Sequence, residues 1–176
     1  RYPRQELEDI KILKKNAVDL IYIPKLKDIY PNGYSTYLSE NLYSNLLCGQ
    51  NRKNHFSGVS TIILKLFLLI NPAVAFFGEK DFQQLQIIKN LAKQKKWDIE
   101  IIGCPIIRET NGLAISSRNQ LLTPALKDKA AILHNTLLWV TKQSSKTKIS
   151  ALEKEVKRQF EKQQDFQLDY FCIAEE

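Results

Sequence analysis

An alternation of buried helices and largely apolar strands constrains the fold of this chain more than any other feature of its sequence. Apolar residues cover nearly every face of a helix predicted over residues 56–69, and Asn71-Pro72 ends it. The next five residues, 73–77, are all apolar and stop at Gly78. This pattern is typical of a parallel strand that is covered on both faces.

The same order of elements recurs before and after this strand. Asp81 stands at an expected N-cap, and a helix stripe follows it, made of Leu85, Ile88, Leu91 and Ala92. Residues 99–102 then form a second apolar run before Gly103, and a helix ending near Asn16 precedes a β-branched run at 18–23. Repeated alternation predicts an α/β fold with a doubly wound parallel sheet, where ligands bind beyond the carboxyl ends of the strands.

The character of the sequence changes after Pro105. The elements expected there are an irregular stretch to Asn119, a helix opened by Thr123-Pro124, a charged helix over about 150–163 and a strand over 166–173. We therefore predict a boundary between two domains. Residues 1–105 form part of the sheet domain, and residues 106–176 form a small α+β domain.

Charge and composition narrow the possible classes of function. The formal net charge of +7 indicates an anionic partner, although much of the charge lies in Lys-rich helical stretches that are more typical of a solvated surface. No nucleic-acid motif is present, and no face interleaves basic with aromatic residues. The longest apolar run, 62–70, contains Lys65 and is too short for a bilayer. Three cysteines without Cys-x-x-Cys spacing predict neither a zinc site nor a disulfide framework, and they suit a reducing cytoplasm.

The first candidate site is Phe-Gly-Glu-Lys-Asp-Phe-Gln-Gln at 77–84, where a strand is expected to turn into a helix. Backbone N–H groups at a helix N-terminus attract phosphate, Lys80 adds a charge for phosphate oxygens, and Asp81 can hold Mg²⁺. Gln84, one turn later, offers both a donor and an acceptor to a substrate with hydroxyl and carboxylate groups. A simpler interpretation makes Asp81 only an N-cap and Lys80 only a solvated charge.

The second candidate site is Gly-Leu-Ala-Ile-Ser-Ser-Arg-Asn at 112–119, which has neither a helical nor a strand period. Two hydroxyls, on Ser116 and Ser117, stand beside Arg118. Together they can grip a polyphosphate, with the guanidinium countering charge as pyrophosphate departs. Taken alone, the motif is more typical of a Ser-rich loop before a helix.

A third candidate is the polar loop at 49–58, which leads into the buried helix. Arg52 and His55 can meet a carboxylate or a phosphate there. A lone histidine is more often a loop or capping residue, so the chemistry alone leaves both interpretations open.

Together these clusters resemble the pantothenate synthetase family. The resemblance rests on the motifs at 77–84 and 112–119, on His55-Phe56-Ser57-Gly58-Val59 and on the opening Arg1-Tyr2-Pro3-Arg4, in an order and spacing that agree across nearly the whole chain. It implies a Rossmann-like domain of the nucleotidyltransferase superfamily followed by a smaller domain. It also implies a cytoplasmic, homodimeric enzyme that uses ATP and Mg²⁺ to join pantoate to β-alanine through a pantoyl adenylate, with release of AMP and pyrophosphate.

The resemblance also implies roles for individual residues. Residues expected to contact ATP are Gly78, Glu79, Lys80, Asp81, Ile107, Ile115, Ser116, Ser117 and Arg118. Of these, Lys80, Ser116, Ser117 and Arg118 are the expected catalytic residues, and Asp81 is the expected Mg²⁺ ligand. Gln84 is expected to hold pantoate, and Arg52 and His55 are further candidates.

The chain departs from the family pattern in two ways. The family's early His-containing phosphate motif and early pantoate-binding Gln have no counterpart, so we expect the central and C-terminal part of a longer protein, inactive by itself. The family also commonly has Arg-Pro-Gly-His where this chain has Arg52-Lys53-Asn54-His55, and Glu where Cys48 stands. These changes can displace the loop that carries them.

Three other functions remain open from the sequence. The chain can be another adenylyltransferase of the same superfamily, which transfers AMP to a phosphorylated acceptor and releases a dinucleotide. It can also be a non-catalytic nucleic-acid-binding module, or a catalytically inert half that is stable only in a dimer. The pair Gln83-Gln84 and the setting of residues 114–118 favour the ligase.

Overall fold

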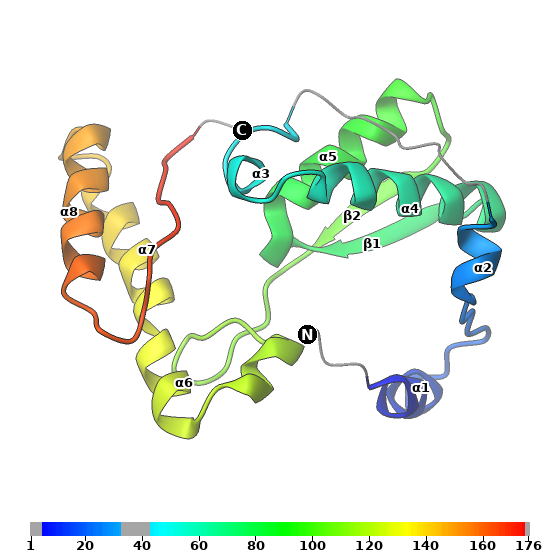
Figure 1. The fold of residues 1–176 in the computed structure, drawn as a ribbon, viewed down its shortest axis with the longest axis horizontal. Coiled ribbons are helices and arrows are strands. Elements are labelled where there is room, and N and C mark those ends of the chain that lie inside the picture. Colours follow the sequence, from blue (N-terminus) through cyan, green and yellow to red (C-terminus); the bar gives the residue numbers. More distant parts are fainter. Residues whose placement is uncertain (1–4, 33–42, 175–176) are drawn as a thin grey trace. The chain divides into compact units, whose positions relative to one another are not determined.

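The computed structural model describes residues 5–32 and 43–174, and the chain divides into two compact units, residues 1–37 and 38–176 (Figure 1). The opening motif, Arg1-Tyr2-Pro3-Arg4, lies outside the described residues. In the first unit, α1 (Glu6–Lys15) confirms the predicted helix and is followed by the short α2 (Leu26–Ile29).

The strand predicted over residues 18–23 is wrong. This segment is irregular, and Leu20 is 82% exposed. A strand is stable only when its N–H and C=O groups pair with a neighbour. Among the described residues, the only sheet lies in the second unit and does not include this segment.

A two-stranded parallel sheet forms the centre of the second unit. Strand β1 (Val74–Gly78) pairs in register with β2 (Glu100–Cys104), from Val74 beside Glu100 to Gly78 beside Cys104. Both strands lie within two residues of their predicted positions, so the expected parallel sheet of an α/β fold is confirmed. Because the strands are parallel, their carboxyl ends meet at one edge.

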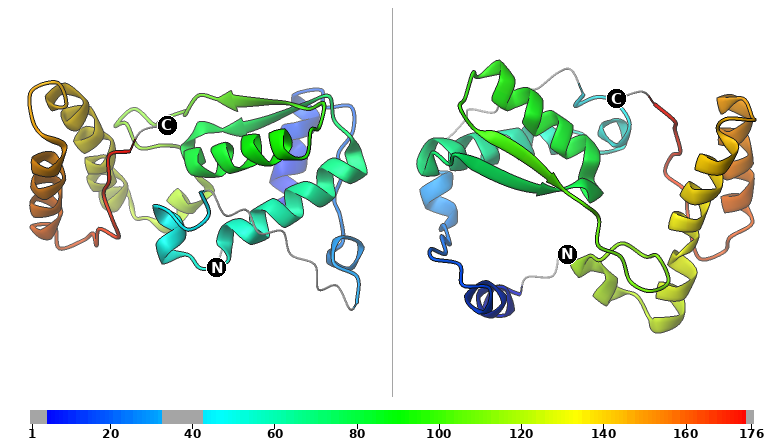
Figure 2. Two further views of the ribbon diagram at one scale, coloured as in Figure 1. Left: turned by 90° about the horizontal axis from the view of Figure 1, so that it is seen from above. Right: turned by 180° about the vertical axis from the view of Figure 1, so that it is seen from behind.

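Two long helices cover one face of this sheet (Figure 2). Helices α4 (His55–Ile70) and α5 (Phe82–Gln94) lie on the same side, with α5 against both strands and α4 against α5. The predicted stripe of α5 is buried, together with Ile87. Burying one such side chain contributes about 1.5–3 kcal/mol, so the stripe holds α5 firmly. Phe67 of α4 reaches Phe77 of β1, with ring centroids 6.4 Å apart.

The other face of β1 is open among the described residues, which contradicts the prediction of a strand covered on both faces. Phe76 is 66% exposed and Val74 38% exposed, whereas Ala75 and Phe77 are half-buried. This alternation is that of a strand covered on one side.

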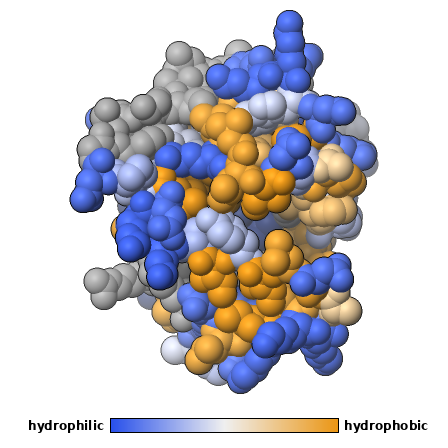
Figure 3. Space-filling view, turned by 90° about the vertical axis from the view of Figure 1, so that its right-hand side faces the viewer, coloured by the Kyte–Doolittle hydropathy of each residue, from blue (hydrophilic) through white to orange (hydrophobic). Residues whose placement is uncertain are grey.

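Figure 3 shows apolar side chains gathered in broad patches on one face of the molecule. No helix in the described part of the chain is both long and apolar enough to cross a membrane.

Three helices follow the sheet: α6 (Pro124–Ala130), α7 (Ile132–Gln143) and α8 (Ile149–Glu161). The helix predicted to open at Thr123-Pro124 is capped there, since the Thr123 hydroxyl accepts a hydrogen bond from the backbone N–H of Leu126 at 3.3 Å. It is interrupted at Ala131, which separates α6 from α7. The core between α7 and α8 consists of Val140, Leu152, Val156 and Phe160.

Residues 166–173 form no strand, contrary to the prediction. Phe166, Leu168, Phe171 and Ile173 instead pack against the core between α7 and α8. The alternating apolar pattern therefore reflects one-sided burial against helices and not pairing with a second strand. The predicted domain boundary between residues 105 and 106 stays a prediction.

Candidate ligand-binding site

The carboxyl end of β1 turns into α5 through a short 3-10 helix, η1 (Glu79–Asp81). Asp81 stands at the N-cap position of α5, but its carboxylate accepts no capping hydrogen bond. Its Oδ1 lies 3.6 Å from Nζ of Lys80, and the two side chains are 62% and 42% exposed. The capping interpretation of Asp81 is thus not supported, and both charges remain accessible to a ligand.

Gly78 and Glu79, the two residues before Lys80, have different surroundings. A Cβ built on Gly78 would meet no atom within 4 Å, so neighbouring atoms do not demand glycine there. Glu79 turns toward β2, where its Oε1 would lie 3.0 Å from a Cβ on Gly103. Open space therefore lies above the backbone of Gly78, while the Glu79 carboxylate covers the end of the neighbouring strand.

A cavity of about 470 Å³ lies beside this turn. Its walls bring together five residues predicted from separate motifs: Arg52, His55, Lys80, Asp81 and Gln84. The other lining residues are Tyr43, Leu47, Cys48, Phe56, Phe82, Gln83, Gln86 and Tyr170. The volume is within the range of about 300–1,000 Å³ that is usual for small-molecule sites.

The wall that faces α5 begins with a tight turn and the one-turn helix α3 (Cys48–Asn51). The backbone N–H of Gly49 donates to the carbonyl of Leu46 at 2.8 Å, and Leu47 has φ 47° and ψ −123°. A turn residue with this backbone is usually glycine, because a Cβ is strained there. Gly49 is required for a different reason, since a Cβ on it would overlap the carbonyl of Ser44.

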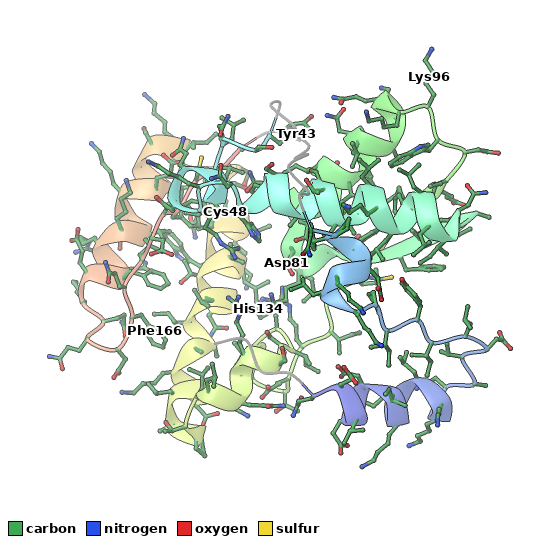
Figure 4. The ribbon with its side chains drawn as sticks, turned by 45° about the vertical axis from the view of Figure 1, so that its right-hand side comes forward. Tyr43, Cys48, Asp81, Lys96, His134 and Phe166 are labelled. Atoms are coloured by element: carbon green, nitrogen blue, oxygen red, sulfur yellow. The ribbon has the colours of Figure 1, made fainter. Side chains whose placement is uncertain are left out.

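Gln83 connects the two walls. Its Nε2 donates to the carbonyls of Tyr43 and Leu46, both at 2.8 Å, and its Oε1 accepts from Sγ of Cys48 at 3.1 Å. Cys48 and Tyr43 on one wall and Asp81 on the other are labelled in Figure 4. Sequence reasoning missed this role, because the partners of Gln83 lie 35 to 40 residues earlier and no local pattern links them to it.

The charges of three separate segments act on one imidazole. Burial lowers the pKa of His55 most, Arg52 lowers it further, Asp81 raises it, and Arg118 lowers it again. The imidazole of His55 therefore tends to be neutral at pH 7. Since Coulomb interactions weaken with distance, the effect of Arg118 places its charge within electrostatic reach of the cavity.

Residues 105–121, which we call the C-terminal loop, form a compact turn of their own. Arg108 and Ala114 pair in an antiparallel bridge, and the N–H of Ile115 donates to the carbonyl of Ile107 at 2.9 Å. The sequence predicted that Ile107 and Ile115 both contact ATP. The structure brings them side by side, with 68% and 55% of their surfaces exposed.

A glycine and a histidine shape this loop. Gly112 has φ +91°, and a Cβ on it would overlap the ring of His134 in α7. The Gly112 carbonyl also accepts from Nη1 of Arg108 at 3.1 Å. His134 thus fits against a loop position that has no side chain.

The serines and the arginine of the second motif open η2 (Ser117–Leu121). The Ser116 hydroxyl accepts from the backbone N–H of Arg118 at 3.3 Å. Ile107, Ile115, Ser116, Ser117 and Arg118 are not among the residues that line the cavity. What links this motif to the cavity is the charge of Arg118 acting on His55.

The residues present suit a shared Mg²⁺ ion better than one held by the protein alone. Within residues 5–32 and 43–174, no group of three or more His, Cys, Asp or Glu side chains is arranged to hold a metal. Asp81 supplies one accessible carboxylate beside the cavity. Mg²⁺ in nucleotide sites is commonly bound by one or two carboxylates together with substrate phosphates, and Asp81 fits that pattern.

Comparison with known proteins adds a family to this geometry. All 176 residues match a family model described as pantoate-beta-alanine ligase. A pantothenate synthetase of Acetivibrio thermocellus is 44% identical over 138 residues, which are 78% of this chain and 49% of that protein. One from Caldicellulosiruptor bescii is 37% identical over 172 residues, 97% of this chain and 61% of that protein. The chain thus spans about half to three-fifths of the length of these relatives.

Solved structures agree with the fold. A crystal structure of pantothenate synthetase from Thermus thermophilus superposes with a TM-score of 0.89 at 34% identity, covering 97% of this chain and 62% of that one. A pantoate-beta-alanine ligase from Francisella tularensis, complexed with beta-gamma ATP and beta-alanine, gives a TM-score of 0.76 at 35% identity. That match covers 90% of this chain and 60% of the other.

Proposed function

We propose that the protein joins pantoate to β-alanine at the expense of ATP. The chain belongs to the pantoate-β-alanine ligase family, and this membership supports the proposal. The observation that carries the proposal is the shared cavity, in which Lys80, Asp81 and Gln84 from the start of α5 meet Arg52 and His55 from the facing wall. These side chains supply the positive charge and the hydrogen-bonding groups that two anionic substrates need.

The start of α5 holds the phosphates of ATP. The backbone N–H groups at a helix N-terminus attract anions, and Lys80 adds a positive charge beside this one. The open space above Gly78 allows the nucleotide to approach the backbone closely. Asp81 would hold Mg²⁺, which neutralises phosphate charge when it is bound.

Gln84 and the facing wall hold pantoate. The Gln84 carboxamide can accept a hydrogen bond from a hydroxyl and donate one to a carboxylate. Arg52 supplies a fixed positive charge across the cavity. Because His55 tends to be neutral at pH 7, we assign it a hydrogen-bonding role and not that of a second cation.

The C-terminal loop acts on the nucleotide from the other side. The exposed pair Ile107 and Ile115 offers an apolar surface to the adenine base. Ser116, Ser117 and Arg118 follow directly, and in this proposal they counter the charge that develops on the departing pyrophosphate. Because the apolar pair is followed by the polar motif, one loop would contact both the adenine base and the phosphates of ATP.

The reaction then proceeds in two displacements. A carboxylate oxygen of pantoate attacks the α-phosphorus of ATP, and the bond to pyrophosphate breaks to leave pantoyl adenylate. The amine of β-alanine next attacks the acyl carbon, losing a proton, and AMP leaves with the electrons of the broken C–O bond. The protein contributes positioning and charge neutralisation in both steps.

We further propose a homodimer in the cytoplasm. The family resemblance supports the dimer. The support for the compartment is the odd number of cysteines, Cys48, Cys104 and Cys172, without Cys-x-x-Cys spacing.

The test is an exchange assay with the intact protein. We expect radioactive pyrophosphate to enter ATP only when pantoate is present, and AMP to accumulate only when β-alanine is added as well. We expect this of the intact protein and not of residues 1–176 alone. Absence of pantoate-dependent exchange would contradict the proposal, and formation of a dinucleotide with a phosphorylated acceptor would indicate the related adenylyltransferase reaction instead.

A further inference from the structure

Two adjacent glutamines of α5 are used in different ways. Successive residues of a helix point about 100° apart, so Gln83 and Gln84 face different surroundings. The Gln83 carboxamide nitrogen donates to two backbone carbonyls, and its oxygen accepts from the Cys48 thiol. Among the described residues, the structure gives no hydrogen-bond partner to the Gln84 side chain. Gln84 is therefore available to a ligand, whereas Gln83 is committed to the protein.

The partners of Gln83 surround the strained residue of the facing wall. Leu46 and Cys48 are the immediate neighbours of Leu47, whose positive φ of 47° is unfavourable for a residue with a side chain. The Leu46 carbonyl accepts from Gly49 within the turn and from Gln83 across the cavity. A strained turn persists only where its surroundings hold it. The Gln83 carboxamide contacts the residues on both sides of Leu47, namely Leu46 and Cys48.

This arrangement couples the positions of the two walls. The turn is followed directly by α3 and then by α4, so it sets where Arg52 and His55 stand in the facing wall. Gln83 itself belongs to the first turn of α5, next to the lining residues Lys80 and Gln84. Its three hydrogen bonds run directly from one wall to the other.

We propose that Gln83 is a positioning residue of the ligase site, which fixes the separation of the two walls without touching the substrates. This inference rests on the proposed function for its consequence, the binding of pantoate between Gln84 and the facing wall. Loss of the three hydrogen bonds weakens the binding of pantoate equally in the ground state and in the transition state, because the two walls hold the substrate throughout the reaction. Such a uniform loss raises KM and leaves kcat nearly unchanged.

The test compares Gln83→Met with Gln94→Met in the intact protein. Methionine keeps the length of the side chain but neither donates nor accepts as an amide does, and Gln94 is an exposed residue at the other end of α5. We expect Gln83→Met to raise the pantoate KM about five- to tenfold, with kcat within about twofold of wild type, since two donated bonds are lost. Gln94→Met is expected to change neither constant.

A second measurement does not depend on catalysis. Cys48 loses its hydrogen bond to the Gln83 carboxamide in Gln83→Met, so its alkylation by a maleimide should become severalfold faster. Cys172, which is exposed, provides the reference rate in the same molecule, and peptide mass analysis separates the two thiols. Gln83→Glu is the second variant, because it keeps the shape and the acceptor but cannot donate to the two carbonyls; it should raise the pantoate KM as well.

These measurements separate failure of the inference from failure of the proposed function. If wild type shows no pantoate-dependent exchange, the proposed function fails, and the thiol rates then decide whether Gln83 holds the turn. An unchanged pantoate KM in active Gln83→Met and Gln83→Glu proteins overturns the positioning role whatever the thiol rates. An unchanged Cys48 rate overturns it even in a protein without ligase activity. Thermal midpoints measured in parallel identify any variant that has simply lost its fold.

Discussion

The two motifs that we propose bind phosphate are held in place in different ways. The first motif, residues 77–84, runs from the end of β1 through η1 into the start of α5, whose Leu85, Ile88 and Leu91 are between 0% and 2% exposed. The C-terminal loop, residues 105–121, is held mainly by its own hydrogen bonds, such as the one from Ile115 to Ile107. One motif is attached to the core of the sheet, whereas the other is held by hydrogen bonds within the loop and by contacts with α6 and α7, such as the bonds from Asn111 to Lys127 and Asp128.

This difference suggests a division of labour. Elements attached to a core open only with much of the fold, whereas a loop with few buried contacts opens locally at small cost. We therefore propose that the start of α5 binds ATP and pantoate before the reaction. We propose that the C-terminal loop moves over the phosphates and acts on charge as it develops, as many closing loops do in enzymes.

The largest expected effect comes from removing the charge at the start of α5. Lys80→Ala should lower the rate of pantoate-dependent pyrophosphate exchange by more than about tenfold, because a charge-assisted contact to phosphate is worth about 1.5–3 kcal/mol. The measurement is the initial rate of exchange at saturating pantoate. Lys89→Ala is the matched control, since Lys89 is an exposed lysine further along α5.

If Lys80→Ala exchanged pyrophosphate at the rate of wild type, the start of α5 would not hold the phosphates. The proposed role of this motif would then be wrong. A similar loss in Lys89→Ala would show that the effect comes from the overall charge of the protein and not from one contact. A fixed phosphate site is supported only if Lys80→Ala loses exchange activity and Lys89→Ala does not.

A smaller effect is expected from a change in the C-terminal loop. Gly112→Ala introduces a Cβ at φ +91° that also overlaps the ring of His134. We expect the free energy of unfolding to fall by about 1–3 kcal/mol, with a severalfold loss of exchange activity as the loop is displaced. Chemical denaturation and the exchange assay provide the two measurements.

Two comparisons identify the cause of that loss. Gly58→Ala, in α4, is the control, because a Cβ there meets no atom within 4 Å and alanine favours a helix. Adding His134→Ala to Gly112→Ala should recover part of the stability, since the overlap is removed while the strained φ remains. No recovery would mean that the ring of His134 does not limit this position.

The motifs that could be predicted from the sequence are those with local signals. Strand β1 and the start of α5 were predicted correctly, because an apolar run, Gly78 and the stripe of α5 lie within about 20 residues of one another. The same reasoning failed for 18–23 and 166–173, which have strand-like composition. A strand requires a partner elsewhere in the chain, and composition does not reveal whether one is available.

The facing wall of the cavity shows a second limit. No rule predicts that Leu47 adopts a backbone that glycine prefers, because the turn depends on hydrogen bonds from Gln83, which is 36 positions later in the sequence. The sequence placed Gln83 in a motif and could not say which of the paired glutamines contacts the protein. Gly49 was a usable signal, since a glycine next to a polar loop often marks a close approach of the backbone.

The smallest expected effect tests whether the two motifs meet at all. Burial and Arg52 hold the pKa of His55 below its ordinary value of 6.5, and Arg118 from the C-terminal loop lowers it further. Arg52→Gln should therefore raise the pKa of His55, Arg118→Gln should raise it by less, and Asp81→Asn should lower it. The measurement is an NMR titration of the imidazole Cε1–H signal of His55, which is identified as the signal that disappears in His55→Gln.

The direction of the accompanying stability change follows from the same shift. Because the folded-state pKa of His55 lies below the unfolded value, its contribution is fully present above pH 6.5 and is lost as the pH falls through the folded-state pKa. His55 is only half-buried, so this contribution is small, and the titration is the more sensitive measurement. If Arg118→Gln left the pKa of His55 unchanged while Arg52→Gln raised it, the charge of the C-terminal loop would not reach the cavity. The two motifs would then have to be brought together by closure of the loop over bound ATP, and repeating the titration with ATP present would show whether Arg118 approaches His55 only in that state.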